Sequence, residues 1–424
     1  MRRVILTTIA TALVASAVPM ATAHAAENPV QPTQFGQHVI QIAQGAVPTT
    51  PYGAIRFWDS GVTWGQVEQK KGKYWWNGLD AAVQNANNQG KPILYVLGSS
   101  PTWAAKNPSQ GKYPNKGAAS VPDMKAWKSW VTAVARRYGS SIDSYQIWNE
   151  ASLSDFYQGT PKEMAALTKE AYKIIRRYDP TAKVVAASST VRLESAFNRF
   201  FPAYLKELKK VGWPVDVISI HTYPDGLGTP ADRAGYIELA KKEMRQAKVP
   251  ARMALWDTEI NYGIKGPGKI KGRQITGDTA AAWVAQTYLQ DLLYGIDRAY
   301  WYYWYQPDGR LGIVMQPGTP GAVGYQTTYN WLANSYYSCT PGDVNVCQMG
   351  SNDDPEVVVW ATSGNGPYTV PANATVQCTA MNVCTPVAPG TQINVGSMPL
   401  WFGSDARNAA NQATLAAQQA APVS

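Results

Sequence analysis

The chain has 424 residues, of which 45% are apolar and 16% are charged. At roughly 150 residues per domain this length predicts two to three domains, and the composition excludes a chain that is disordered throughout. The formal charge is +9 without any long run of like charges, which argues against a nucleic-acid-binding tail. The aromatic residues are mostly Tyr (24) and Trp (16), whose apolar faces and polar edges suit an amphipathic ligand.

Residues 1–25 have the pattern of a secretory signal peptide. Arg2 and Arg3 precede a mostly apolar run over residues 4–18, and Ala23-His24-Ala25 fits a small-x-small cleavage site. The run is shorter than the ~20 residues that a membrane helix needs, and we find no later stretch that could span a membrane. We expect cleavage after Ala25 and an extracellular protein; an uncleaved anchor is the alternative. Loss of the two arginines leaves 36 basic and 29 acidic residues, a charge of +7.

Residues 26–334 alternate short apolar runs with longer amphipathic ones. The runs are nearly continuous in hydrophobicity, which is typical of strands buried on both faces. Eight such strands with helices between them predict an α/β fold, a closed (β/α)8 TIM barrel. The predicted strands lie at 35–42, 54–58, 92–97, 144–148, 183–187, 215–220, 252–256 and 298–304. The predicted helices lie at about 122–138, 160–178, 194–211, 231–246 and 277–294. Residues 43–52 are too short and Pro-rich for a crossover helix.

The pattern changes after residue 334. Residues 335–403 lack a helical period and show strand-like runs at 356–360, 368–370, 375–377 and 392–395, separated by Gly, Pro, Asn and Asp. They predict a small all-β, sandwich-like module. Residues 404–424 are rich in Ala, Gln and Asn and lack aromatic residues, so we expect a flexible tail.

All four cysteines lie in the β module: Cys339, Cys347, Cys378 and Cys384. Export would allow them to form disulfides, and four cysteines allow three pairings. The separations of 8 and 6 residues favour Cys339–Cys347 and Cys378–Cys384, each closing a short loop. Such short loops gain little from chain entropy, so the bonds are expected to stiffen the module locally.

Two glutamates follow predicted barrel strands, where active-site side chains of such barrels lie. The fourth strand leads into Trp148-Asn149-Glu150, and the seventh into Trp256-Asp257-Thr258-Glu259. Cleavage of a glycosidic bond needs two carboxyl groups, one to protonate the leaving oxygen and one to attack the anomeric carbon or to activate water. The pair therefore predicts a glycosidase.

The chain resembles clan A glycoside hydrolases, and is most similar to family 39 and related exopolysaccharide hydrolases. The resemblance rests on Asn149-Glu150, on Glu259, and on residues 55–59 (IRFWD), 64, 68 and 98–104 (GSSPTWA). It implies that Glu150 is the acid/base, that Glu259 is the nucleophile and that cleavage retains the anomeric configuration. It implies no metal or organic cofactor. The substrate would be a polysaccharide or an oligosaccharide.

Further candidates surround this pair. We expect Arg56 to keep Glu259 ionised, with a plain core salt bridge as the alternative. We expect Asn149 to bind the sugar hydroxyl beside the reacting carbon, with a cap on the strand end as the alternative. The resemblance places His221 and Tyr223 at the cleaved sugar, with the Tyr hydroxyl near the nucleophile; His221 could instead be an ordinary core histidine.

Aromatic side chains near the strand ends are candidate sugar platforms. We expect Trp304 to be the best of them, and Trp103 and Tyr262 to border the groove, although a buried Trp is ordinary core material. The loop over residues 265–273 holds four cations and three glycines. It is either a solvated loop or a contact for an anionic polysaccharide.

Endo-cleavage of an extracellular or cell-wall polysaccharide is the function that we predict. An exo-acting glycosidase of the β-xylosidase, iduronidase or arabinose-releasing type, transglycosylation with the same residues, and a non-catalytic carbohydrate-binding barrel remain alternatives. Only two histidines follow residue 25, and there is no Cys/His cluster, which argues against a catalytic zinc.

Overall fold

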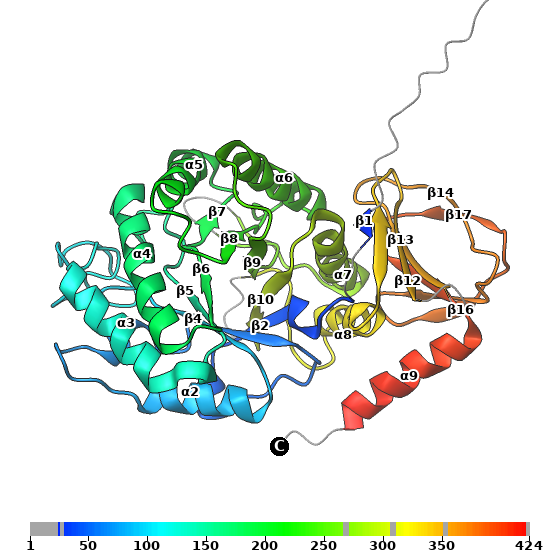
Figure 1. Cartoon of the computed structure of the whole chain (residues 1–424). Coiled ribbons are helices and arrows are strands. Elements are labelled where there is room, and N and C mark those ends of the chain that lie inside the picture. The colour runs from blue at the N-terminus through cyan, green and yellow to red at the C-terminus, as the bar shows by residue number, and fades with distance from the viewer. Residues whose placement is uncertain (1–23, 26–28, 266–270, 306–310, 351–354, 421–424) are drawn as a thin grey trace, which may run out of the picture.

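The structure is a computed structural model of the chain, and it describes residues 24–25, 29–265, 271–305, 311–350 and 355–420. A barrel and a β module lie side by side, with a C-terminal helix below the module (Figure 1). Of the predicted signal peptide, residues 1–23 lie outside the described residues. His24–Ala25 form the two-residue strand β1, which pairs antiparallel with β11 (Tyr337–Thr340) of the module.

The barrel is closed by parallel strands in the order β6-β5-β4-β3-β2-β10-β9-β8-β7, and a β6–β8 pairing completes the ring. The fifth barrel position is split between two short strands, β6 and β7, so nine strands make eight positions. This confirms the predicted (β/α)8 barrel. The strands are β2 (Phe35–Val39), β3 (Ala54–Phe57), β4 (Ile93–Val96), β5 (Ser144–Gln146), β6 (Lys183–Val185), β7 (Ser189–Thr190), β8 (Val217–His221), β9 (Ala254–Ile260) and β10 (Arg298–Trp304).

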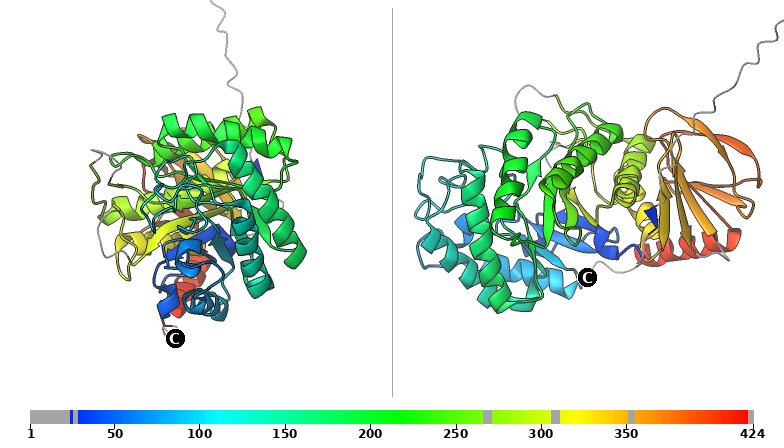
Figure 2. Two further views of the ribbon diagram at one scale, coloured as in Figure 1. Left: turned by 90° about the vertical axis from the view of Figure 1, so that its left-hand side faces the viewer. Right: turned by 45° about the horizontal axis from the view of Figure 1, so that its top comes forward.

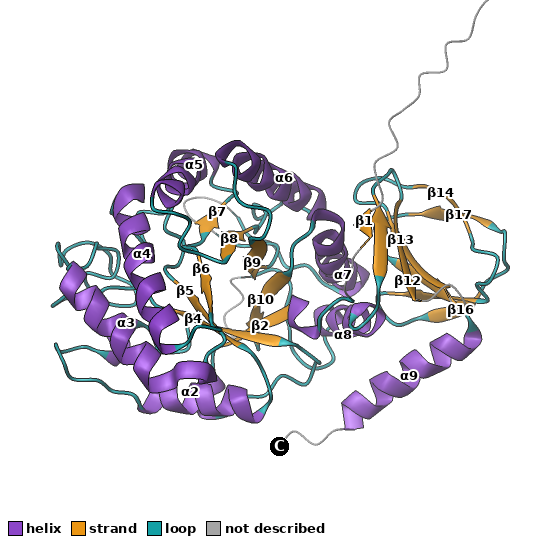
Figure 3. Cartoon of the chain, viewed as in Figure 1, coloured by secondary structure: helices purple, strands orange, loops and turns teal. Residues whose placement is uncertain are grey.

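Helices surround the barrel (Figure 3). The five predicted helices correspond to α3 (Met124–Tyr138), α4 (Pro161–Tyr178), α5 (Glu194–Lys210), α6 (Pro230–Ala247) and α7 (Gly277–Tyr294). Three others lie outside these predicted ranges: α1 (Trp64–Val67), α2 (Asn77–Asn88) and α8 (Pro320–Leu332). Thr160 and Glu163 form a capping box at the start of α4, because each side chain binds the backbone N–H of the other. Between β2 and β3 the chain has only the 3-10 turn Ile42–Gln44, as the Pro-rich sequence predicts.

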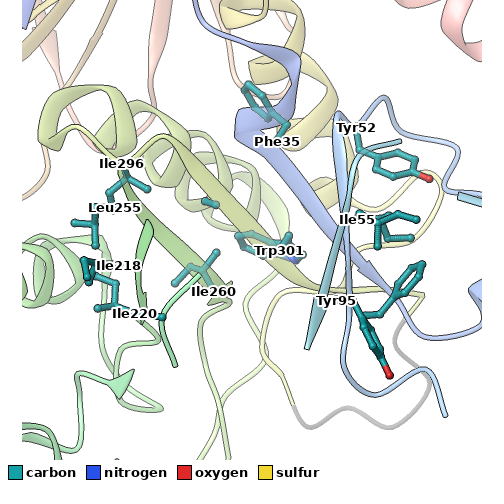
Figure 4. Close-up of a cluster of buried hydrophobic side chains, with 14 of the residues drawn as sticks. Phe35, Tyr52, Ile55, Tyr95, Ile218, Ile220, Leu255, Ile260, Ile296 and Trp301 are labelled. Atoms are coloured by element: carbon teal, nitrogen blue, oxygen red, sulfur yellow. The ribbon is translucent and has the colours of Figure 1, made fainter. Parts of the chain in front are cut away.

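The main core lies between the strands and the surrounding helices. Outward-facing strand side chains such as Phe35, Ile55, Ile218 and Leu255 belong to one large buried cluster (Figure 4). The barrel interior is apolar at the amino ends of the strands and polar two residues further on, because successive inward-facing positions are two residues apart. The apolar layer consists of Ala54, Leu94, Val185, Val217, Trp256 and Tyr300. The polar layer above it includes Arg56, Gln146, Ser219 and Thr258.

The C-terminal module contains a seven-stranded antiparallel sheet and a two-stranded one, as expected for an all-β module. Its remaining strands are β12 (Asn345–Gly350), β13 (Pro355–Trp360), β14 (Gly366–Thr369), β15 (Val376–Thr379), β16 (Cys384–Pro386), β17 (Gln392–Val395) and β18 (Leu400–Gly403). The predicted disulfides Cys339–Cys347 and Cys378–Cys384 are both present. Each joins neighbouring antiparallel strands at directly opposed positions.

Most of the expected flexible tail is instead a helix, α9 (Asp405–Ala420), that runs beneath the module (Figure 2). Its Ala- and Gln-rich composition suits a helix, and polar contacts hold it in place. Arg407 Nε lies 2.5 Å from the buried carboxylate of Glu356, and Gln412 exchanges amide hydrogen bonds with Asn382. Within the described part of the chain, no helix is long and apolar enough to cross a membrane.

Candidate active site

Arg56 joins the ends of three barrel strands in one buried network. It lies on β3 and has no exposed surface. Its Nε donates to Gln146 Oε1 at 2.8 Å, and its Nη2 donates to Asn149 Oδ1 at 2.7 Å. Its Nη1 donates to Glu259 Oε1 at 2.6 Å. The guanidinium therefore holds both predicted glutamate-bearing strand ends at fixed positions, and Asn149 is left with its amide Nδ2 as the donor for a ligand.

Glu150 follows β5 and has a backbone φ of 42°, a left-handed conformation that non-glycine residues rarely adopt. Two neighbours hold its carboxylate. Thr190 Oγ1, on β7, donates to Oε1 at 2.5 Å, and His221 Nδ1 lies 3.1 Å from the same oxygen. The backbone N–H of Glu150 donates to Ser188 Oγ at 2.9 Å. The split of the fifth barrel position thus provides two side chains that orient the predicted acid/base.

Glu259 owes its direction to an irregularity in β9. In a regular strand Asp257 and Glu259 would face the same side. The register between β8 and β9 shifts at this point, and bulges of this kind re-aim side chains. Asp257 faces outward, as alternation from the inward-facing Trp256 requires, and accepts from Arg233 Nη2 at 2.9 Å. Thr258 faces the barrel interior, and the shift turns Glu259 to the interior as well. Tyr223 OH donates to Glu259 Oε2 at 3.0 Å.

The two glutamates face each other across the top of the barrel. One carboxylate oxygen of Glu150, one of Glu259 and a ring nitrogen of His221 all lie within 4.8 Å of one another. His221 Nδ1 is 3.5 Å from Glu259 Oε2 and 3.1 Å from Glu150 Oε1, so the imidazole lies between the carboxylates. The fold therefore brings the pair, Glu150 and Glu259, together with the four side chains that were predicted around it: Arg56, Asn149, His221 and Tyr223.

Burial raises the pKa of both glutamates above the ordinary value for Glu. Their partners differ. The Glu150 carboxylate accepts from a neutral hydroxyl, and the charges of Arg192 and Arg56 lower its pKa only from beyond hydrogen-bonding distance. Glu259 accepts directly from a guanidinium and from a phenol, both of which favour its ionised form. The geometry therefore makes Glu259 the more readily ionised of the two.

Burial lowers the pKa of His221 to about 4, so the imidazole is neutral near pH 7. His38, on β2, has a pKa well below its usual value because it is buried beside the Arg56 guanidinium. Both histidines therefore act here as hydrogen-bonding groups and leave Arg56 as the cation next to Glu259.

A cleft of about 510 Å³ opens above the carboxylate pair. Trp58 and Phe156 form one part of its wall, with ring centroids 6.2 Å apart. Tyr302 and Tyr303, on β10, form another part. The cleft residues also include Ile40, Asp59, Tyr113, Asn149, Glu150, Arg192, Tyr223, Glu259, Ile264, Lys265 and Leu311.

The three predicted aromatic platforms are not among the residues that line this cleft. Trp304 is only 4% exposed, and Tyr262 is fully buried, with its hydroxyl 2.9 Å from Thr287 Oγ1. Trp103 packs against the core and donates from Nε1 to the backbone oxygen of Glu68 at 2.8 Å. The prediction for Trp304 assumed regular alternation along the strand, but the register of β10 against β2 shifts between residues 301 and 304. Tyr302 and Tyr303 consequently take the place that we assigned to Trp304.

Asp59 is a cleft residue that we did not predict as a functional one. Its two carboxylate oxygens accept separately from the hydroxyls of Tyr113 and Tyr302. Burial raises its pKa, and these two hydrogen bonds oppose that rise. The available signal was its position two residues after the second strand, within the segment 55–59 that carries the resemblance. Arg192 was also missed, although it follows the fifth strand in the same way.

The cationic loop is divided by the structure. Lys265 lines the cleft, whereas Arg273 Nη2 donates to the backbone oxygen of Leu227 at 3.1 Å and its guanidinium lies over Trp283. Lys271 is exposed, and Lys269 lies outside the described residues. Of the described cations in this loop, Lys265 is therefore the one that could meet a ligand in the cleft.

The cluster of Glu150, His221 and Glu259 has a spacing that could also hold a cation. Its electrostatics favour a different use, because the Arg56 guanidinium already provides a positive charge 2.6 Å from Glu259. A second cation there would be repelled. The arrangement is better suited to a paired acid and nucleophile than to metal binding.

The chain is similar to known glycoside hydrolases over part of its length. A family model described as glycosyl hydrolase family 10 matches residues 58–230, less than half of the chain, a range that contains Glu150 and ends before Glu259. A beta-xylosidase of Caldicellulosiruptor saccharolyticus is 28% identical over 34% of this chain and 32% of its own. The matched part thus spans about a third of that relative's length.

Two solved structures share the fold over most of the chain. A family 39 glycoside hydrolase of Bacteroides cellulosilyticus WH2 aligns with a TM-score of 0.66 at 17% identity, covering 89% of this chain and 81% of its own. The GH39 enzyme of Xanthomonas axonopodis pv. citri aligns with a TM-score of 0.61 at 15% identity, covering 89% and 95%. These matches confirm the predicted resemblance: the chain has the barrel of clan A glycoside hydrolases and is similar to family 39 among them.

Proposed function

We propose that the protein is a retaining glycosidase that acts on an extracellular or cell-wall polysaccharide. The observation that carries the proposal is the distance of at most 4.8 Å between one oxygen of Glu150 and one of Glu259. Retaining enzymes hold their carboxyl groups ~5–5.5 Å apart, whereas inverting enzymes leave ~6.5–9.5 Å for a water molecule. The two disulfides support action outside the cell.

In the first step a Glu259 oxygen attacks the anomeric carbon, and the bond from that carbon to the leaving oxygen breaks. Glu150 gives its proton to the leaving oxygen. In the second step Glu150 takes a proton from water, the water oxygen bonds to the anomeric carbon, and Glu259 leaves as a carboxylate. Arg56 and Tyr223 stabilise this carboxylate before and after the covalent stage. Asn149 offers a donor to the adjacent sugar hydroxyl, a contact that strengthens as charge develops.

We propose endo-cleavage because the cleft has a volume of about 510 Å³. Clefts of ~300–1,000 Å³ hold drug-sized ligands, which are larger than one sugar ring. The cleft therefore has room for more than one sugar of a chain. Early release of oligosaccharides of mixed length would support endo action. Release of one monosaccharide from the chain end would instead favour the exo-acting alternative. The similarity to a beta-xylosidase is the observation that favours this alternative.

The test compares the wild type with Glu150→Gln and Glu259→Gln on a panel of bacterial and plant polysaccharides. We expect Glu150→Gln to lower the rate by about 10²- to 10⁴-fold and Glu259→Gln to abolish turnover. The exposed Glu238→Gln, on α6, is the matched control and should retain wild-type activity. NMR of the first product should show the anomeric configuration of the substrate. Inversion would refute retention, and unimpaired mutants would refute the carboxylate pair.

A non-catalytic carbohydrate-binding barrel makes the opposite prediction. Such a protein would bind a polysaccharide without releasing products. Mass spectrometry of the wild type incubated with a slowly turned-over 2-fluoro glycoside would show a covalent sugar on the peptide that contains Glu259 only if the barrel is catalytic.

A further inference from the structure

Arg192 is a buried cation in the wall of the cleft whose hydrogen-bonding groups are not used. It is 9% exposed and lines the cleft together with Glu150. Its Nε and Nη1 make no hydrogen bond within the described part of the chain. The nearest ion-pair partner is Asp225, whose Oδ1 lies 3.7 Å from Nη1, beyond hydrogen-bonding distance, on a side chain that is 56% exposed.

Leaving a buried guanidinium in this state costs free energy, since a buried donor without a partner loses its hydration and gains nothing in return. The barrel's other buried arginines show the contrast. Arg56 and Arg233 have no exposed surface, and each donates to at least one carboxylate. Arg192 therefore has the burial of a structural arginine without its partners, as expected of a group that is completed by a ligand.

The position of Arg192 relates it to the reacting groups. It comes two residues after Thr190, whose hydroxyl holds the Glu150 carboxylate. Its charge is also close enough to lower the pKa of Glu150. The unused guanidinium thus lies beside the predicted acid/base, where the cleaved bond would be.

The chemistry of the cleft indicates what ligand group Arg192 would meet. A guanidinium presents paired N–H donors that match the two oxygens of a carboxylate. The cleft's own carboxylates are already engaged: Glu259 accepts from Arg56, and Asp59 accepts from two tyrosines. Lys265 adds a second positive charge to the lining.

Building on the proposed glycosidase function, we propose that the substrate is an acidic polysaccharide and that a uronic acid bound beside Glu150 places its carboxylate against the guanidinium of Arg192, where that side chain lines the cleft. Such a carboxylate would also neutralise the charge that favours ionisation of Glu150, which helps the acid to keep its proton before the first step.

The test uses four acidic polysaccharides: glucuronoxylan, polygalacturonate, alginate and hyaluronan. Each is offered in its native form and after chemical reduction of the carboxyl groups, which keeps the linkages but removes the charge. We expect the wild type to cleave at least one native form at least tenfold faster than its reduced form. Arg192→Gln should lose about 10- to 100-fold on that native substrate, the loss of a charged hydrogen bond, and should not change on the reduced one. Arg192→Lys should fall between them.

The exposed Arg199→Gln, on α5, is the control for loss of one positive charge and should match the wild type. Thermal melting of each variant reports folding. Electrophoresis through native gels that contain the native or reduced polysaccharide reports binding without turnover. Four outcomes would each overturn the acidic-substrate proposal. The first two are equal cleavage of native and reduced forms by the wild type, and an equal loss of activity by Arg192→Gln on both forms. The other two are cleavage of, or retardation by, neutral glycans alone, and neither cleavage of nor retardation by any of the four acidic polysaccharides.

The two proposals fail in different ways. If Glu150→Gln and Glu259→Gln cleave as well as the wild type, or if binding that depends on Arg192 occurs without turnover, the glycosidase assignment fails while the carboxylate site stands. If both glutamate variants are inactive but Arg192→Gln treats native and reduced substrates as the wild type does, only the carboxylate site fails.

Discussion

At the residue scale, the environment of Glu150 decides whether it can act as an acid. The carboxylate must keep a proton near neutral pH and then lose it to the leaving oxygen. Burial raises its pKa, whereas the Thr190 hydroxyl and two arginines lower it. Several opposing neighbours thus adjust one carboxyl group, and each of them can be removed separately.

We predict that Thr190→Val shifts the alkaline limb of the kcat/KM profile to higher pH. The Thr190 hydroxyl donates to the ionised carboxylate and lowers the pKa of Glu150. Without this donor the pKa of Glu150 rises, so the protonated acid persists to higher pH. The acidic limb, which reports ionisation of the other member of the pair, should move less. Thr190→Ser keeps the donor and should retain the wild-type profile; an unchanged or downward-shifted alkaline limb in Thr190→Val would contradict the assignment of Glu150 as the acid.

At the element scale, helix α9 shows how a buried charge helps to hold a weakly patterned segment on the module. Glu356, on β13, is 2% exposed and accepts from Trp401 Nε1 at 2.7 Å and from Arg407 Nε at 2.5 Å. Arg407 lies in the first turn of α9, and its side chain is 42% exposed. The pair connects the helix to the seven-stranded sheet, so a tertiary contact adds to the helix propensity of α9.

We predict that Arg407→Gln lowers the stability of the module by about 1 kcal/mol, because it leaves a buried carboxylate without its cation, while partial exposure lets water replace some of the loss. Calorimetry should show a lower melting temperature with unchanged kcat/KM, since α9 contributes no residue to the cleft. Adding Glu356→Gln to this variant should restore part of the loss. A double mutant no more stable than Arg407→Gln would show that the ion pair does not anchor the helix.

At the scale of the whole molecule, the β module covers one side of the barrel. Helix α4 buries one face, whereas α7 is buried at every position from residue 280 to 292. The views in Figures 1 and 2 place α7 and α8 between the barrel strands and the module. Gln286, on α7, donates from Nε2 to the backbone oxygen of Ser397 in the module at 2.5 Å. The module therefore completes the hydrophobic environment of these helices.

We predict that a chain ending at residue 334 is less stable than the full chain and aggregates on heating, because the outer faces of α7 and α8 become exposed apolar surface. Its melting temperature should fall by several degrees, and the soluble fraction should retain its kcat/KM, since the described cleft residues all precede residue 334. A chain that ends at residue 404 and lacks only α9 should lose less. Equal melting temperatures for the barrel alone and the full chain would show that the module is not a brace.

Much of the fold was accessible from the sequence, because its signals are local. Strands buried on both faces need continuous apolar runs, and these located all eight barrel positions. The capping box at Thr160 marked the start of α4, and short separations indicated both disulfides. Helix α8 lies outside the predicted helices, and helix α9 occupies most of the expected tail.

The catalytic pair was also accessible, because strand ends converge in a barrel whatever the loops do. Which side chains face the cleft was decided only by the tertiary structure, because it depends on deviations from regular strand geometry. The register shift in β9 directs Glu259 inward, and the shift in β10 buries Trp304 and presents Tyr302. The unused guanidinium of Arg192 is visible only once its possible partners are located. The residue types thus determined which chemistry is available, while strand register and burial determined which side chains can reach a substrate.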